Sequence, residues 1–327
     1  MNIPMTQHLV IPFAACADPA WAHAMKALPA SNLPHLSQLL ARMKLVTSIQ
    51  GDAHSLSPPH ERVLAAALGL PECADGLIPW AALEAEKTEV ANGKPWAFIT
   101  PCHWAMGREH ATLTDPADLA LTPDEAHTLR AAMQPYFDTE GITLHAVTRS
   151  RWLAEGEVFR NLPTASLDRV LGRNVDAWLP DKTTAGSLRR LQNEMQMLLY
   201  THPLNDARSA QRQRTVNSFW ISGSGVLSAS TSAPANDSPI TSAVTSPSTL
   251  AQAVFTNDWA AYVAAWATLD ADNIAQLLAR QKAGDVVRLT LCGDSHAQTF
   301  ESVKTSIFSQ IQSFFKPMST YSLLEQL

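Results

Sequence analysis

The sequence predicts an α/β protein with a central, mostly parallel sheet flanked by helices, and two stretches carry that prediction. Leucine and methionine recur at helical spacing from Leu188 to Leu199, and an apolar run follows at residues 217–222. The segment Asp285–Cys292 alternates apolar and polar side chains, which is the pattern of a half-buried strand. Helices that lead into short buried strands are typical of α/β folds.

The other elements follow from periodicity and from residues that cap or break helices. A helix is expected from Thr122, because Thr122 is a good N-cap and Pro123 fits the first turn. Gly172 and Pro203 each end a helical pattern. The remaining expected elements are strands at residues 8–14, 96–104, 142–147 and 251–255, and helices at residues 57–89, 165–171, 259–266 and 270–282.

Length and composition bound the domain organisation. With 327 residues, of which 46% are hydrophobic, the chain is long enough for one large α/β domain or two modest ones, and we expect a single domain over residues 1–327. Residues 228–250 consist mostly of Ser, Thr, Ala and Pro, which bury too little apolar surface to offset the entropy of ordering. We therefore expect a flexible insertion at about residues 228–250.

Charge and cysteine usage restrict the partners and the compartment. The net charge of −6 offers no broad basic surface, so neither nucleic acid nor a membrane is an expected partner. The four cysteines are scattered without the spacing of a zinc site or a disulfide framework, which favours reduced thiols. No signal peptide or membrane-spanning apolar stretch is recognisable. The sequence therefore predicts a cytoplasmic protein.

Polar residues gather where the 188–199 helix gives way to the strand at 217–222. His202, Asn205 and Arg208 lie just after the helix, and Asn217 lies at the start of the strand. Loops between helix and strand are where α/β proteins place ligands, so these four are the candidate substrate-binding residues. The same residues also fit a helix cap, a salt link and a tight turn. Ser224, between two glycines, is the candidate nucleophile, although Gly-Ser-Gly is also common in turns.

Two sequence segments around these residues resemble a known family. The segments are His202-Pro-Leu-Asn205-x-x-Arg208 and Val216-Asn-Ser-Phe-Trp-Ile-Ser-Gly-Ser-Gly225. They resemble cofactor-independent phosphoglycerate mutases of the archaeal type, in the alkaline phosphatase superfamily. The arrangement is also similar to a proteobacterial family of mutase-like proteins, some of them Rpf-type regulators of pathogenicity factors (the E member). This similarity runs with gaps over residues 96–225 and again over residues 289–300.

The resemblance implies a partial or degenerate alkaline-phosphatase-like fold. Active family members use two divalent metal ions, a nucleophilic serine and a pocket of arginines and histidines. Manganese or zinc is implied only if this chain is active, with His103, Asp294 and His296 as candidate ligands. The chain departs from the pattern at its first strand, where Pro12 and Phe13 stand in place of a metal-binding aspartate.

Three hypotheses remain open from the sequence. The first is a catalytically degenerate mutase-like protein that binds a phosphorylated metabolite or a protein partner in a regulatory role. The second is an active metal-dependent phosphomutase or phosphatase. The third is a non-catalytic interaction module in which the polar residues only support the fold.

Overall fold

The computed structural model describes residues 6–26, 33–88, 93–227, 243–303 and 320–327. The chain divides into two compact units. Unit 1 comprises Met1–His54, Pro58–Pro71 and Pro234–Leu327, and unit 2 comprises Ser55–Ser57 and Glu72–Ala233. Each unit packs helices against a β-sheet, which confirms the predicted α/β class. The expectation of one domain over residues 1–327 stays a prediction, because two compact units can still unfold together.

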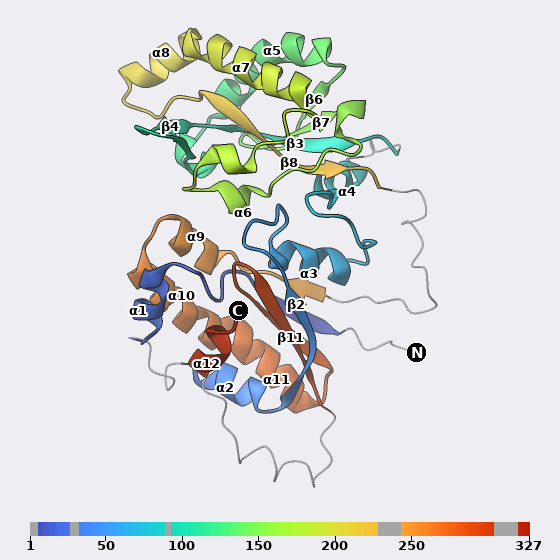
Figure 1. The fold of residues 1–327 in the computed structure, drawn as a ribbon. Coiled ribbons are helices and arrows are strands. Elements are labelled where there is room, and N and C mark those ends of the chain that lie inside the picture. Colours follow the sequence, from blue (N-terminus) through green and yellow to red (C-terminus); the bar gives the residue numbers. More distant parts are fainter. Residues whose placement is uncertain (1–5, 27–32, 89–92, 228–242, 304–319) are drawn as a thin grey trace. The chain divides into compact units, whose positions relative to one another are not determined.

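Unit 1 is built on a five-stranded mixed sheet (Figure 1). Its strands lie in the order β2 (Met43–Gln50), β11 (His296–Ser302), β10 (Val287–Cys292), β1 (Gln7–Ile11) and β9 (Ala243–Thr245). β1 pairs in parallel with both β9 and β10, whereas β11 pairs antiparallel with both β10 and β2. The parallel part of the sheet therefore lies at β9, β1 and β10.

Alternation along β1 buries both faces of this sheet. Leu9 and Ile11 face the larger apolar cluster, whereas Val10 packs with Val63 on the other side. The larger cluster takes side chains from α1 (Pro19–Lys26), α2 (Pro34–Leu40), α9 (Thr249–Phe255), α10 (Trp259–Leu269), the π-helix Asp270–Ile274, α11 (Ala275–Ala283) and α12 (Thr320–Leu324). The smaller cluster takes Val63 from α3 (Pro59–Ala67). Helices therefore flank the sheet on both faces.

Unit 2 is built on an antiparallel four-stranded sheet with a separate hairpin. The strand order is β6 (Thr143–Ala146), β7 (Trp152–Glu155), β3 (Trp96–Cys102) and β8 (Ser218–Gly225), and the hairpin pairs β4 (Trp104–Met106) with β5 (Ala111–Leu113). The helical segments are α4 (Trp80–Glu86), η2 (Pro116–Leu119), α5 (Pro123–Thr139), η3 (Glu157–Phe159), α6 (Leu167–Val170), η4 (Val175–Trp178), α7 (Gly186–Tyr200) and α8 (Pro203–Ala210).

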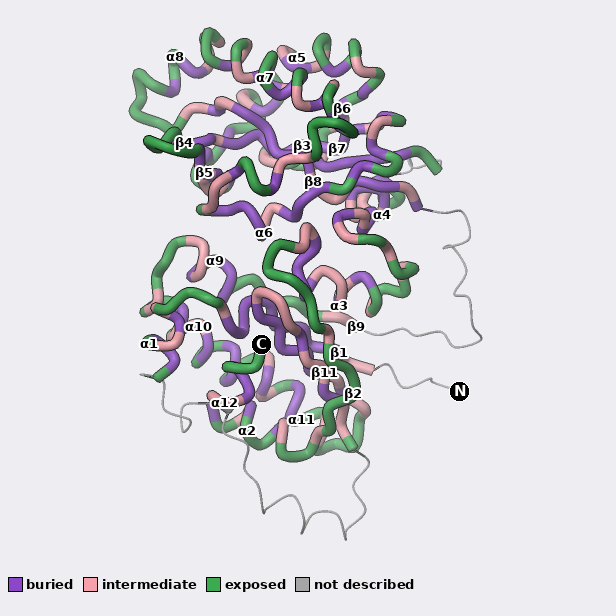
Figure 2. Tube along the Cα trace, viewed as in Figure 1, coloured by how far each residue is buried: buried purple, intermediate pink, exposed green. Residues whose placement is uncertain are grey.

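The core of unit 2 follows the predicted helical periodicity. Leu129, Met133 and Phe137 of α5 are fully buried in one cluster with Leu191 and Met195 of α7. Their spacing of three or four residues places each set on one helix face, which packs against the sheet. Figure 2 shows the inner sides of these helices as buried and their outer turns as exposed.

Several expectations differ from the structure. The helical stretch expected at residues 57–89 consists of two separate helices, α3 and α4, because prolines at positions 71 and 79 interrupt it. Residues 251–255 lie within the helix α9 and do not form a strand, because a five-residue apolar run has no periodicity that separates the two. Part of the expected insertion is ordered: residues 243–245 form β9, in register with Gln7–Leu9 of β1. The start of α9 also falls within it. Residues 228–242 of that insertion lie outside the described residues.

Within the described segments, no helix has the length and apolar character needed to cross a membrane.

Candidate functional site

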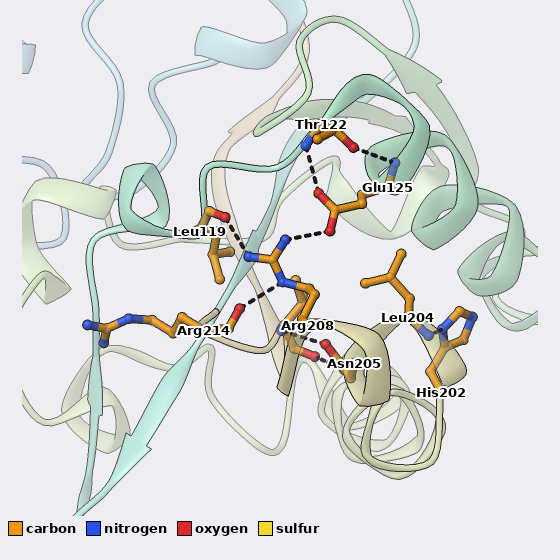
Figure 3. Close-up of polar contacts among 9 residues, drawn as sticks. Leu119, Thr122, Glu125, His202, Leu204, Asn205, Arg208 and Arg214 are labelled. Carbon is orange, nitrogen blue, oxygen red and sulfur yellow. Dashed lines mark hydrogen bonds and ion pairs between the residues drawn. The ribbon is translucent and has the colours of Figure 1, made fainter. Parts of the chain in front are cut away.

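Arg208 of α8 is the centre of the polar cluster that the sequence singled out (Figure 3). The residue is only 2% exposed. Its guanidinium donates from Nε to the Arg214 carbonyl at 2.8 Å, from Nη1 to Glu125 Oε1 at 2.7 Å, and from Nη2 to the Leu119 carbonyl at 2.5 Å. The three bonds point to three different segments, so Arg208 ties α8 to η2, to α5 and to the chain that enters β8.

Glu125 serves both the helix start and this cluster. The Thr122 N–H donates to Glu125 Oε2 at 2.8 Å, and the Glu125 N–H donates to Thr122 Oγ1 at 3.2 Å, which completes a capping box. Burial by itself would raise the pKa of Glu125, but the hydrogen bonds from Thr122 and Arg208 and the charge of Arg208 outweigh it and lower the pKa. The carboxylate is therefore held ionised against the buried guanidinium.

His202 and Asn205 also make bonds inside the fold. His202 is the N-cap of α8, and its Nδ1 accepts from the Leu204 N–H at 3.2 Å. Asn205 Nδ2 donates to the Leu199 carbonyl at 2.7 Å and to the Val216 carbonyl at 2.6 Å. Its Oδ1 accepts from the Val216 N–H at 2.9 Å. Asn205 therefore fastens the end of α7 to the segment that leads into β8.

Three of the four predicted substrate-binding residues thus lie on one helix. The side chains of Asn205 and Arg208, however, are hydrogen-bonded to other segments of unit 2. Ligand binding by His202, Asn205 and Arg208 stays a prediction. For Asn205 and Arg208, which are both buried, it would require breaking bonds that hold unit 2 together.

Asn217, the fourth predicted residue, lies beside the β4–β5 hairpin. Its Oδ1 accepts from the Trp104 N–H at 2.7 Å, and its Nδ2 donates to the Trp104 carbonyl at 3.0 Å. The side-chain amide thereby pairs with the hairpin backbone as a neighbouring strand would. Asn217 also lines a groove of about 470 Å³, which we call the hairpin groove.

The hairpin groove is formed by three elements of unit 2. Its lining comprises residues 104 and 106–111 of the hairpin, residues 175 and 176 of η4, Gln196 and Tyr200 of α7, and Asn217. Two large hydrophobic side chains of the lining are strongly exposed, Met106 at 80% and Tyr200 at 83%, and Met197 of α7 is 72% exposed. The sequence pattern did not reveal this site, because nothing in the periodicity connects α7 with the hairpin.

Ser224, the candidate nucleophile, is fully buried. Its Oγ donates to the Leu162 carbonyl and lies 2.9 Å from Thr164 Oγ1, and its N–H donates to the same Thr164 oxygen at 3.3 Å. The hydroxyl therefore links β8 to the loop that precedes α6. A nucleophilic role stays a prediction, and it would require Ser224 to leave these bonds and reach a substrate.

The candidate metal ligands also have partners within the protein. His103 Nδ1 lies 2.8 Å from the Thr215 carbonyl in unit 2. In unit 1, Asp294 Oδ2 accepts from the Ala17 N–H at 2.7 Å, and His296 Nδ1 lies 2.7 Å from Ser295 Oγ. Nowhere in the described part of the chain do three His, Cys, Asp or Glu side chains gather as a metal site requires. Metal binding by His103, Asp294 and His296 therefore stays a prediction.

The end of β1 is apolar where the family resemblance implies a metal-binding aspartate. The ring of Phe13 packs against His60 at 5.5 Å and Phe255 at 5.1 Å between ring centroids. The Tyr262 hydroxyl donates to the Phe13 carbonyl at 2.7 Å and accepts from Trp21 Nε1 at 3.0 Å. Aromatic packing and a buried hydroxyl thus occupy this end of the strand.

No family model matches the chain, and no curated protein matches it. Among solved structures, the PH0037 protein from Pyrococcus horikoshii is similar over 93% of this chain and 90% of its own, with 13% identity and a TM-score of 0.43. A cofactor-independent phosphoglycerate mutase from Thermoplasma acidophilum is similar over 98% of this chain and 100% of its own, with 13% identity and a TM-score of 0.34. Both TM-scores lie below 0.5, so neither similarity assigns an activity to the chain.

Proposed function

We propose that this chain is a catalytically inactive, mutase-like protein that acts in the cytoplasm by binding a protein partner in a regulatory role. The observation that carries the proposal is the buried bonding of Arg208, the residue best suited to hold a phosphate. A guanidinium that already serves a carboxylate and two carbonyls has little capacity left for a substrate. The regulatory role is what the resemblance to Rpf-type proteins implies.

The hairpin groove supports a protein partner. Methionine and tyrosine are enriched at protein interfaces, since both offer large contact areas and methionine adapts its shape. Met106 and Tyr200 line the groove and are mostly exposed, and so is Met197 of α7, whereas Leu188, Leu191, Met195 and Leu199 of the same helix are buried. A partner that covers the three exposed side chains would remove apolar surface from water.

The charged residues that line the groove indicate which charge a partner segment should carry. Glu109 and Asp176 line it with a single arginine, Arg108, so carboxylates are in excess. The whole chain is also negative, with a net charge of −6. A partner segment with an apolar anchor beside Lys or Arg therefore fits better than a phosphorylated metabolite, which two carboxylates would repel.

The cytoplasmic location is supported by the thiols. Cys102 and Cys292 are buried thiols that form no disulfide bond. Burial raises the pKa of both buried thiols, so they remain protonated and unreactive. Free, unpaired cysteines are typical of proteins in reducing compartments.

Site-specific photo-crosslinking in cells tests the groove. With a photo-reactive phenylalanine at Met106, we expect one discrete crosslinked species, and Tyr200→Ala in the same chain should abolish it. The matched control places the same group at Tyr136, which is 37% exposed on α5 and does not line the groove. Identical species from both positions, or a species that survives Tyr200→Ala, would argue against a partner in the groove.

A further inference from the structure

A second cavity, of about 370 Å³, lies at the β6 side of the unit 2 sheet. Its apolar part is formed by Trp96, Leu144 and Leu153, each less than one-tenth exposed. The polar part is formed by His145 of β6, Arg130 of α5 and Thr88. The cavity shares no lining residue with the hairpin groove.

Two buried nitrogen atoms at this cavity lack hydrogen-bond partners among the described residues. Trp96 is 1% exposed, and its Nε1, which can only donate, has no acceptor. His145 Nε2 is also buried and unpaired, at 3.9 Å from Glu155 Oε2, which is beyond hydrogen-bond distance. The two rings lie together, with 5.3 Å between their centroids.

A buried polar nitrogen without a hydrogen-bond partner is unfavourable, so two such nitrogens in one cavity indicate a missing polar ligand. Other indole N–H groups are also unpaired in the described part of the chain, at Trp104, Trp152 and Trp266. None of these three lines the cavity, although Trp104 lines the hairpin groove. The distinguishing feature of the cavity is that two unpaired nitrogens occur together with a cation and an apolar floor.

Arg130 supplies the positive charge. Its Nη2 lies 3.5 Å from His127 Nδ1, at the limit of a hydrogen bond, and none of the ion pairs found among described residues includes it. Lys94, by contrast, is bound to Glu155 at 2.6 Å. Burial lowers the pKa of His145, and the positive charges of Lys94 and Arg130 lower it further. The negative charge of Glu155 raises this pKa but does not outweigh the other effects. The imidazole is therefore neutral near pH 7, and Arg130 is the charge available to a ligand.

We propose that this cavity binds a small molecule that carries one oxyanion group, a carboxylate or a phosphate monoester, on a compact apolar body. The oxyanion accepts from Trp96 Nε1 and from the guanidinium of Arg130, and the neutral His145 contributes one further hydrogen bond. The apolar body lies against Leu144, Leu153 and the indole ring. Recognition then depends on charge at one end and on shape at the other.

Nuclear magnetic resonance of the full-length, ¹⁵N-labelled protein tests the proposal directly. The indole N–H signal of Trp96 is assigned by its loss in Trp96→Phe and is followed during titration with benzoate, phenyl phosphate and benzamide. We expect a saturable shift with benzoate, with phenyl phosphate or with both, and the responding ligand identifies the oxyanion. Benzamide, which has the same ring without the charge, should give no saturable shift.

Arginine variants provide the matched comparison. Arg130→Gln should weaken anion binding at least ~10-fold, which corresponds to the loss of one charge-assisted hydrogen bond of about 1.4 kcal/mol. Arg190→Gln, on the exposed face of α7, should leave it unchanged. A Trp96 signal that responds to no anion, an equal response to benzamide, or an equal effect of both arginine variants would overturn the proposal. None of these readouts depends on a protein partner, so failure here leaves the hairpin groove unaffected.

Discussion

Replacing Arg208 with methionine is expected to destabilise unit 2 by about 3 kcal/mol, because it removes one member of a buried ion pair. The side chain of Arg208 is 3% exposed and that of Glu125 is 21% exposed, which places the expected loss at the lower end of the range for such pairs. Methionine preserves most of the apolar volume but leaves the Leu119 and Arg214 carbonyls without their donor. Native-state hydrogen exchange of the β3 and β8 amides reports the stability of unit 2 by itself.

Arg190→Met is the control for this prediction. Arg190 also faces a carboxylate, at 3.4 Å from Glu140, but its side chain is 66% exposed. An exposed pair of this kind contributes less than about 1 kcal/mol. Equal losses from the two substitutions would mean that Arg208 is not a structural residue and would restore it as a candidate phosphate ligand.

The second large effect is expected from acid, through His8 of β1. His8 Nε2 lies 2.7 Å from Thr290 Oγ1, which is 2.8 Å from Thr299 Oγ1. The three side chains form a row across β1, β10 and β11, in which His8 and Thr290 are buried. Burial lowers the pKa of His8 from 6.5 to about 4, with a further contribution from the charge of Arg288. The imidazole is consequently neutral in the folded protein over most of the accessible pH range.

The direction of the pH effect follows from proton binding. Between pH 6.5 and 4, the unfolded chain binds a proton at His8 and the folded chain does not, so falling pH favours unfolding. The loss approaches about 1.4 kcal/mol per pH unit and totals about 3 kcal/mol. Hydrogen exchange of the β1 and β10 amides as a function of pH measures this loss of stability. His8→Gln should remove this part of the slope, and an unchanged slope would contradict the assignment to His8.

Several elements of the fold were predictable because their signals are local. The capping box at Thr122 and Glu125 needs only neighbouring residues, and the periodicity of α7 is complete within its own segment. The alternation of β10 likewise predicted a strand. β9 was missed because a strand of three residues is too short to show a periodic pattern and forms only by pairing with β1, which lies far away in the sequence.

The candidate site was predictable as a cluster but not in its chemistry. The sequence places His202, Asn205 and Arg208 near one another, yet it does not show that Glu125 and Leu119 would accept from Arg208. A buried arginine with protein partners and an arginine that awaits a phosphate have the same sequence pattern. Only long-range contacts distinguish them, and the same holds for the buried hydroxyl of Ser224.

The central claim, that the chain is a non-catalytic mutase-like protein, is tested most directly by turnover. The purified protein is assayed for metal content and for manganese- or zinc-stimulated hydrolysis of p-nitrophenyl phosphate and isomerisation of phosphoglycerate, beside the double variant Asp294→Ala, His296→Ala. We expect no turnover above the blank with either protein. Metal-stimulated turnover that the double variant loses would contradict the claim and would identify Asp294 and His296 as metal ligands.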